Sequence, residues 1–230
     1  AQSRLGSARQ AVGRVGAMVL PELSLTAEEL AVATTIARRE GLLLLAGAAL
    51  DLPEGPAVTR HANVAVVDTG GPSLHIQRKH HRWCLGREQI EAYGLASRLR
   101  DGAECWELTG IGSRELRFFT HDRWLTFCVL VCEDLARQDP LAEVIRAVGP
   151  NLAVVLLLDG PQLSGRWASR YASILGEDPG CSVLAVTSVG MAGRSRPREA
   201  GRIARPEVIA LGRDYALGER ELTIEAGHDA

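Results

Sequence analysis

Short, nearly continuous apolar runs, divided by polar segments, dominate the hydrophobic pattern of this chain. The longest are strand-sized, as in residues 41–50 (GLLLLAGAAL), 62–67 and 152–158. Runs of this length without polar alternation predict buried strands. We expect further strands at residues 17–20, 74–78, 104–112, 115–120, 126–131, 182–189, 207–211 and 221–225, the segments 104–112 and 115–120 being joined by a turn.

Helical patterns fill much of the chain between these strands. Thr26 and Glu29 have the spacing of a capping box, which predicts a helix that continues to about Glu40. Other helices are expected within residues 2–15, 84–98, 141–148 and 165–175, and loops at 23–26, 51–59 and 190–205. Helices alternate with strands, but several strands follow one another directly. This order predicts an α/β layered architecture with mixed sheets, and we expect a single domain over residues 1–230 because no linker divides the chain.

Composition narrows the class of protein. The net charge of −2 gives no general attraction to nucleic acid or to a membrane surface, and no apolar run reaches the roughly 18 residues of a membrane span. Five cysteines without a CxxC pair argue against a disulfide framework or a zinc site and favour a cytoplasmic location. The chain begins with Ala1 rather than Met, which is compatible with a processed or excised start. Nothing in the sequence calls for a cofactor.

One residue stands out in the charge pattern. Lys79 is the single lysine among 26 basic residues. Lysine offers a compact charge with a tunable pKa, whereas arginine offers a wide and permanently charged fork. A position that retained lysine is therefore a candidate for chemistry that arginine cannot perform, the alternative being a stray substitution without a role.

Three predicted strands end in one reactive residue each, namely Glu22, Lys79 and Cys132. A glutamate can take the proton of a thiol, the thiolate can attack a carbonyl or nitrile carbon, and an ammonium can hold the negative charge that develops. Cys132 lies where a strand passes into an acidic turn, so backbone N–H groups and Lys79 are expected to lower its thiol pKa. The alternative for Cys132 alone is a buried structural cysteine.

Taken in order, the segments PELSLT, RKHH and VLVCEDL resemble the signature of the nitrilase superfamily of carbon–nitrogen hydrolases. The resemblance extends from about Ala17 to Glu225. It implies a nitrilase-like αββα four-layer sandwich with two mixed sheets. It also implies that Glu22 is the general base, Cys132 the nucleophile and Lys79 the stabiliser of the oxyanion, together with the backbone N–H of Glu133.

Many members of that superfamily carry a second glutamate between the lysine and the cysteine. The resemblance of residues 79–88 to the amidase pattern selects Glu88, and the alternative for Glu88 is a solvated position on a helix. Four other glutamates in this interval remain candidates for the second glutamate: Glu91, Glu104, Glu107 and Glu115.

The chain also departs from the family pattern. A strand and a full helix usually precede the "PE" strand, whereas only residues 1–16 do so here, which favours a domain that is incomplete at its N-terminus. The step after PELSLT is Ala27-Glu28 instead of the usual Gly-Tyr, and the arginine-rich residues 193–205 match no family feature.

The leading hypothesis is a carbon–nitrogen hydrolase that acts on a small-molecule amide or nitrile through a thioester. The family resemblance adds an expectation of a homodimer. The alternative is a nitrilase-like module of a larger protein with a role in assembly or regulation, because residues 156–180 resemble the domain fused behind a bacterial reverse transcriptase in antiviral defence. A third hypothesis is the glutaminase domain of an NAD synthetase, which the absence of an ATP-binding Ser-Gly-Gly loop in this sequence disfavours.

Other conspicuous groups have weaker functional interpretations. His75, His80 and His81 lack the spacing of a metal site. Trp167 and Tyr171, four residues apart on a predicted helix, are expected to pack rather than to bind substrate. A basic cluster is expected to be a solvated loop, with an anionic partner as the alternative; it comprises Arg194, Arg196, Arg198, Arg202 and Arg205.

Overall fold

A computed structural model describes residues 2–54, 58–99, 104–112, 114–195 and 205–224. Two larger sheets and one two-stranded sheet form from these residues. The four-stranded sheet has the order β1-β2-β3-β4, with β1 (Ala17–Leu25), β2 (Leu43–Pro53), β3 (Thr59–Asp68) and β4 (His75–Arg78). The six-stranded sheet has the order β12-β11-β10-β9-β8-β7, with β7 (Phe118–His121), β8 (Leu125–Val131), β9 (Leu152–Leu156), β10 (Ser182–Val186), β11 (Val208–Asp214) and β12 (Gly218–Thr223).

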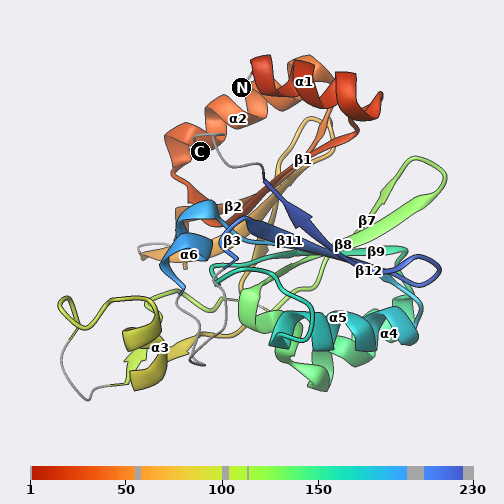
Figure 1. Ribbon diagram of the computed structural model, residues 1–230. Coiled ribbons are helices and arrows are strands. Elements are labelled where there is room, and N and C mark those ends of the chain that lie inside the picture. Colours follow the sequence, from red (N-terminus) through yellow and green to blue (C-terminus); the bar gives the residue numbers. More distant parts are fainter. Residues whose placement is uncertain (1, 55–57, 100–103, 113, 196–204, 225–230) are drawn as a thin grey trace.

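The two larger sheets pack face to face and helices cover their outer faces (Figure 1). Helices α1 (Gln2–Val12) and α2 (Ala27–Glu40) lie over the four-stranded sheet, and α4 (Glu143–Val148) and α5 (Trp167–Glu177) lie over the six-stranded sheet. Both sheets contain parallel and antiparallel pairs. The predicted αββα four-layer sandwich with two mixed sheets is therefore confirmed.

Strand β2 shows why its sequence has no polar alternation. Leu43 and Leu45 belong to the core between the two sheets, whereas Leu44 and Ala46 belong to the core beneath α2. Successive side chains of a strand point to opposite faces, so a strand buried on both faces must be apolar throughout.

Helix α2 begins as its sequence predicts. The Glu29 backbone N–H donates to Thr26 Oγ1, and the Thr26 N–H donates to a Glu29 carboxylate oxygen 2.8 Å away. This capping box satisfies two backbone donors that the first turn of a helix leaves unpaired. At the other end, Gly41 has a φ of 66°, a left-handed conformation that glycine adopts at little cost.

Several predicted boundaries are wrong. Strand β1 continues to Leu25 through the segment expected to be a loop, and β2 continues to Pro53. Residues 104–112 and 115–120 do not form a hairpin, because β6 (Cys105–Trp106) pairs with β5 (Cys84–Leu85) and β7 pairs with β8. The beginning of the expected loop at 190–205 is helix α6 (Val189–Arg194), and residues 196–204 lie outside the described residues.

A lobe projects from one side of the sandwich (Figure 1). It consists of β5, helix α3 (Arg87–Ala92), the turns that follow α3, and β6. The remaining elements are two short helical turns directly after β8, η1 (Cys132–Ala136) and η2 (Gln138–Ala142). Within the described part of the chain, no helix combines the length and the apolarity that crossing a membrane requires.

Two aromatic residues on the β7–β8 hairpin provide a test of the inter-sheet core. Phe127 is fully buried and stacks on Phe119 with ring centroids 5.1 Å apart, whereas Trp124 is 84% exposed near the hairpin turn. We expect Phe127→Ala to lower the free energy of unfolding by about 3–5 kcal/mol, because it leaves a cavity in the core. The control is Trp124→Ala, which we expect to change the free energy of unfolding by less than about 0.5 kcal/mol. Chemical denaturation of the two variants checks this, and equal losses of stability would contradict the packing of Phe127.

Candidate functional site

Three ionisable side chains, of which Glu22 and Lys79 are buried and Glu107 is partly buried, form a chain of ion pairs between the sheets and the lobe. Lys79 Nζ donates to Glu22 Oε1 at 2.8 Å and to Glu107 Oε2 at 2.6 Å. Lys79 and Glu22 are 2% and 1% exposed. A single ammonium thus lies between two carboxylates, which compensates much of the cost of burying the charges.

Asn63, in the middle of β3, binds the same two glutamates. Its Nδ2 donates to Glu22 Oε1 at 2.6 Å and to Glu107 Oε1 at 2.7 Å. The Lys79 backbone N–H in turn donates to the Asn63 carbonyl oxygen. Sequence analysis missed Asn63, although a lone amide inside an otherwise apolar strand is a usable signal, because a buried amide needs polar partners.

An irregularity in β1 aims Glu22 at the site. The register between β1 and β2 shifts between Leu20 and Leu25, and Leu23 has a φ of 51°. Between these two pairs β1 advances by five residues and β2 by two, and an irregularity of this kind redirects side chains. Opposite it, a Cβ on Gly47 would overlap the Pro21 carbonyl oxygen and lie 2.5 Å from Glu22 Cα. The position of Glu22 therefore requires glycine at position 47.

Cys132 lies directly after β8, at the start of η1. Its φ of 47° is in the left-handed region, which is unusual for a residue other than glycine and costs conformational energy. Cys132 is 6% exposed, and the backbone N–H of Leu158 is hydrogen-bonded to its thiol. Strained backbone of this kind is concentrated at functional sites.

Asp134 joins the turn after Cys132 to the loop after Lys79. Its buried carboxylate accepts hydrogen bonds from the backbone N–H groups of His80 and His81 and from His81 Nδ1, at 2.9–3.1 Å. Since Lys79 follows a strand of one sheet and Cys132 a strand of the other, Asp134 fixes the position of each relative to the other.

Four candidate side chains, Glu22, Lys79, Glu107 and Cys132, line one cavity of about 570 Å³. The four-stranded sheet supplies Glu22 and Lys79, the six-stranded sheet supplies Cys132, and the lobe supplies Glu107. The structure thus brings the three residues of the predicted Glu–Lys–Cys set together. Glu133, whose backbone N–H was the other expected oxyanion donor, follows Cys132 directly in η1.

Burial raises the pKa of Glu22, and the neighbouring Glu107 adds to this effect, although Lys79 and Asn63 oppose it. Burial also raises the pKa of the Cys132 thiol well above its usual value, as does Glu22, while Lys79 and the Leu158 N–H act in the other direction. For Lys79, burial alone would lower the pKa, but the carboxylates of Glu22 and Glu107 outweigh it, and a Cys132 thiolate would raise it further. Desolvation disfavours a buried thiolate next to a carboxylate. The expected lowering of the Cys132 pKa is therefore wrong, and the resting site holds a neutral thiol beside a strengthened base.

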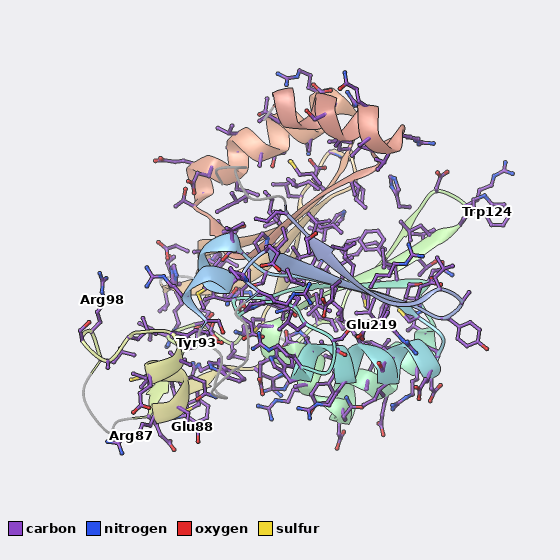
Figure 2. All side chains as sticks on the ribbon, viewed as in Figure 1. Arg87, Glu88, Tyr93, Arg98, Trp124 and Glu219 are labelled. Atoms are coloured by element: carbon purple, nitrogen blue, oxygen red, sulfur yellow. The ribbon has the colours of Figure 1, made fainter. Side chains whose placement is uncertain are left out.

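The structure places Glu107 where Glu88 was predicted. Glu88 lies in the first turn of α3 and is exposed on the outer lobe (Figure 2). Helix α3 buries Ile90, so Glu88 faces another direction. Glu107 follows the two-residue strand β6, where its Oε2 also accepts from the Trp83 N–H. Sequence analysis selected Glu88 rather than Glu107 because the pairing of β5 with β6, which brings Glu107 to the site, was not predicted.

The other conspicuous groups have structural partners. His80 Nε2 lies 3.0 Å from Gln77 Nε2 and 3.1 Å from the Glu115 carbonyl oxygen. Trp167 and Tyr171 contact each other edge to face, as predicted for packing, but Trp167 also lines the cavity. Of the predicted basic cluster, Arg196, Arg198 and Arg202 fall outside the described residues, and Arg205 forms ion pairs with Glu207 and Glu221.

Comparisons with known proteins agree on the fold. No family model and no curated protein matches the sequence. Among solved structures, Nit3 of Saccharomyces cerevisiae, a member of branch 10 of the nitrilase superfamily, is similar with a TM-score of 0.63 and 11% identity, over 96% of this chain and 77% of that one. A CN-hydrolase superfamily protein of Xanthomonas campestris, with an arsenic adduct in its active site, gives a TM-score of 0.58 and 16% identity over 97% and 80% of the two chains.

Two further solved structures extend the comparison. A mutant of the amidase from Nesterenkonia sp. AN1, with acrylamide added to its active-site cysteine, gives a TM-score of 0.59 and 18% identity over 97% of this chain and 81% of that one. The glutamine-dependent NAD+ synthetase of Acinetobacter baumannii gives a TM-score of 0.54 and 15% identity, over all of this chain but only 45% of that one. The chain thus has the fold of the nitrilase superfamily.

Gly47 offers a test of how the site is built. We expect Gly47→Ala to lower the free energy of unfolding by at least about 1–3 kcal/mol, because the added methyl group must displace the backbone of Pro21 and Glu22. Denaturation measurements check this. The matched control is Gly6→Ala on α1, where an added Cβ meets nothing within 4 Å; equal effects of the two substitutions would contradict the close approach described here.

The protonation state of Cys132 offers a second test. The thiolate absorbance of the native protein minus that of Cys132→Ala reports this residue alone, since the other four cysteines cancel. Because burial and Glu22 raise the thiol pKa, we expect no difference near pH 7 and a signal only above about pH 9. A thiolate signal that is complete by about pH 7 would show that Lys79 outweighs burial.

Proposed function

We propose that this protein is a carbon–nitrogen hydrolase that cleaves an amide or a nitrile through a thioester on Cys132. The observation that carries the proposal is the buried Glu22–Lys79–Glu107 chain in the same cavity as Cys132. The nitrilase-superfamily fold supports it, as does the presence of amidases among the proteins with similar structures.

In the first step, Glu22 takes the thiol proton while Sγ attacks the carbonyl carbon of the amide. Glu22 Oε2 is buried and has no hydrogen-bond partner within the described structure, so it is available to accept this proton. A raised carboxyl pKa strengthens the base, and deprotonation during attack removes the need for a stable resting thiolate. The Lys79 ammonium and the Glu133 backbone N–H stabilise the oxyanion of the tetrahedral intermediate.

In the second half of the reaction, the intermediate collapses to a thioester. The C–N bond breaks, the proton held by Glu22 passes to the leaving nitrogen, and ammonia or an amine departs. Water then attacks the thioester carbon as Glu22 takes its proton, and collapse of this second intermediate releases the carboxylic acid and returns the proton to the thiol. Glu107 is a positioning residue in this scheme, because it accepts a second hydrogen bond from Lys79 Nζ beside that of Glu22.

The alternatives to a free-standing amidase stay predictions from the sequence. These are a module fused to a reverse transcriptase in antiviral defence and a glutaminase domain of an NAD synthetase. The homodimer and the cytoplasmic location are likewise predictions. The amidase and glutaminase hypotheses assign the same nucleophile, whereas the module has a role in assembly or regulation that needs none. The experiment below therefore tests the chemistry that the first two share.

The nucleophile is tested by trapping the acyl-enzyme. After incubation with a panel of primary amides, acid quenching and peptide mass spectrometry should find an acyl group on Cys132, with ammonia released into solution. Cys132→Ala should abolish both signals, and Glu22→Gln should lower ammonia release by about 10²–10⁴-fold, as expected for loss of a general base. Cys128→Ala, which alters a buried cysteine on the same strand outside the cavity, is the matched control. Acylation elsewhere, or unchanged turnover in Cys132→Ala, overturns the proposal.

The choice between the two glutamates is tested in the same assay. We expect Glu107→Gln to lower kcat by at least about tenfold, because it weakens the ion pair that positions Lys79. Glu88→Gln, on the exposed face of α3, should leave kcat within about twofold of the native value. The opposite pattern would restore Glu88 to the site and exclude the role given to Glu107.

A further inference from the structure

The cavity is larger and more apolar than the reaction itself requires. Its volume of about 570 Å³ lies in the range of sites for drug-sized ligands. The amide group needs only the buried end of the cavity, here called the floor, where Cys132 and Lys79 are 6% and 2% exposed. Above that floor, three of the chain's four tryptophans line the walls, namely Trp83, Trp106 and Trp167. Leucines of the lobe, including Leu85, Leu95 and Leu99, complete the apolar lining.

Within this aromatic wall, Trp167 is held in place by a hydrogen bond from its indole N–H. Asp159, which is 6% exposed, accepts from Trp167 Nε1 at 2.9 Å and from the Tyr93 hydroxyl at 2.7 Å. Tyr93 belongs to the lobe and Asp159 follows β9, so these bonds fix the lobe to the six-stranded sheet. An aromatic surface that is already ordered binds a flat apolar group with little entropic cost.

The charges of the cavity are arranged unevenly. At the floor, the single positive charge of Lys79 is matched by Glu22 and Glu107, so the floor carries no excess positive charge. Arg98 on the lobe and Arg194 at the end of α6 also line the cavity, and both are exposed. No carboxylate of the described residues pairs with either guanidinium, in contrast to Arg166, which binds Asp159. Figure 2 shows Tyr93 on the side of the lobe nearest the sandwich and Arg98 at its outer part.

From this arrangement we propose that the substrate is an amide with a bulky aromatic body and an anionic group at the end remote from the scissile bond. The amide lies at the floor, the aromatic body lies against the tryptophans, and the anionic group lies at the mouth near Arg98 and Arg194. The floor disfavours the anionic group, because it would meet Glu22 and Glu107, so the charges also set the direction of binding. This inference rests on the proposed function.

Binding to Cys132→Ala tests the inference without turnover. The probes are para-carboxyphenylacetamide, its neutral analogue para-methylphenylacetamide, and acetamide, and the readouts are tryptophan fluorescence and calorimetry at low salt. We expect the carboxylated amide to bind about fivefold more tightly than the neutral aromatic amide, as befits charge pairs at an exposed rim. The preference should fall at high salt, and acetamide should bind more weakly than both aromatic amides.

Variants assign the preference to the two arginines. The double variant Arg98→Gln/Arg194→Gln should bind both aromatic amides equally, whereas Arg87→Gln should keep the preference. Arg87 is an exposed arginine of the same lobe that does not line the cavity, so it is the matched control. Trp106→Ala should weaken both aromatic amides together.

The inference is overturned if the neutral amide binds as tightly as the anionic one, if the preference survives the double variant, or if neither aromatic amide binds. Its failure is distinguishable from failure of the proposed function. Acylation of Cys132 by other amides would uphold the hydrolase while excluding this substrate class. Conversely, binding without acylation of native Cys132 by any amide would uphold the ligand class and exclude the hydrolase.

Discussion

The site depends on one buried ammonium. Lys79 donates to Glu22 and Glu107, which belong to a strand of the four-stranded sheet and to the lobe. Removing one partner of a buried ion pair costs far more than the pair itself contributes, because an uncompensated charge is left behind. These three side chains are therefore interdependent, and Asn63 donates a hydrogen bond to each of the two glutamates. An arginine in place of Lys79 would bring a wider group into a space bounded on two sides by carboxylates.

The sandwich places this cluster against the thiol. Cys132 comes from the second sheet in a strained conformation, and Asp134 ties its turn to the loop that carries Lys79. In this environment the raised pKa of Cys132 favours a neutral thiol, and the raised pKa of Glu22 makes its carboxylate a stronger base. The thiol is therefore protonated before the substrate binds and loses its proton only during the reaction. Proton transfer from the thiol can then coincide with attack on the substrate.

The sequence predicts much of this arrangement. Long apolar runs such as β2 reveal the buried strands, the Thr26 capping box marks the start of α2, and the unique Lys79 marks a reactive position. Three features could not be predicted from the sequence, and each has a physical reason. Glu107 reaches the site through the pairing of two-residue strands, which leaves no periodic pattern, and Asn63 is meaningful only once two glutamates converge on it. The pKa of Cys132 depends on the balance between burial and the charge of Lys79, which a residue pattern does not contain.

The apolar sequence of β2 has a consequence for folding. Because both faces of the strand are buried, sliding it by one residue would exchange leucines and alanines between two cores with little change in hydrophobicity. Gly47 breaks this near-equivalence: after a slip, Ala46 or Ala48 would meet the backbone at Pro21, where only a residue without a side chain fits. The smallest residue of the strand therefore specifies its register, and the hydrophobic ones do not.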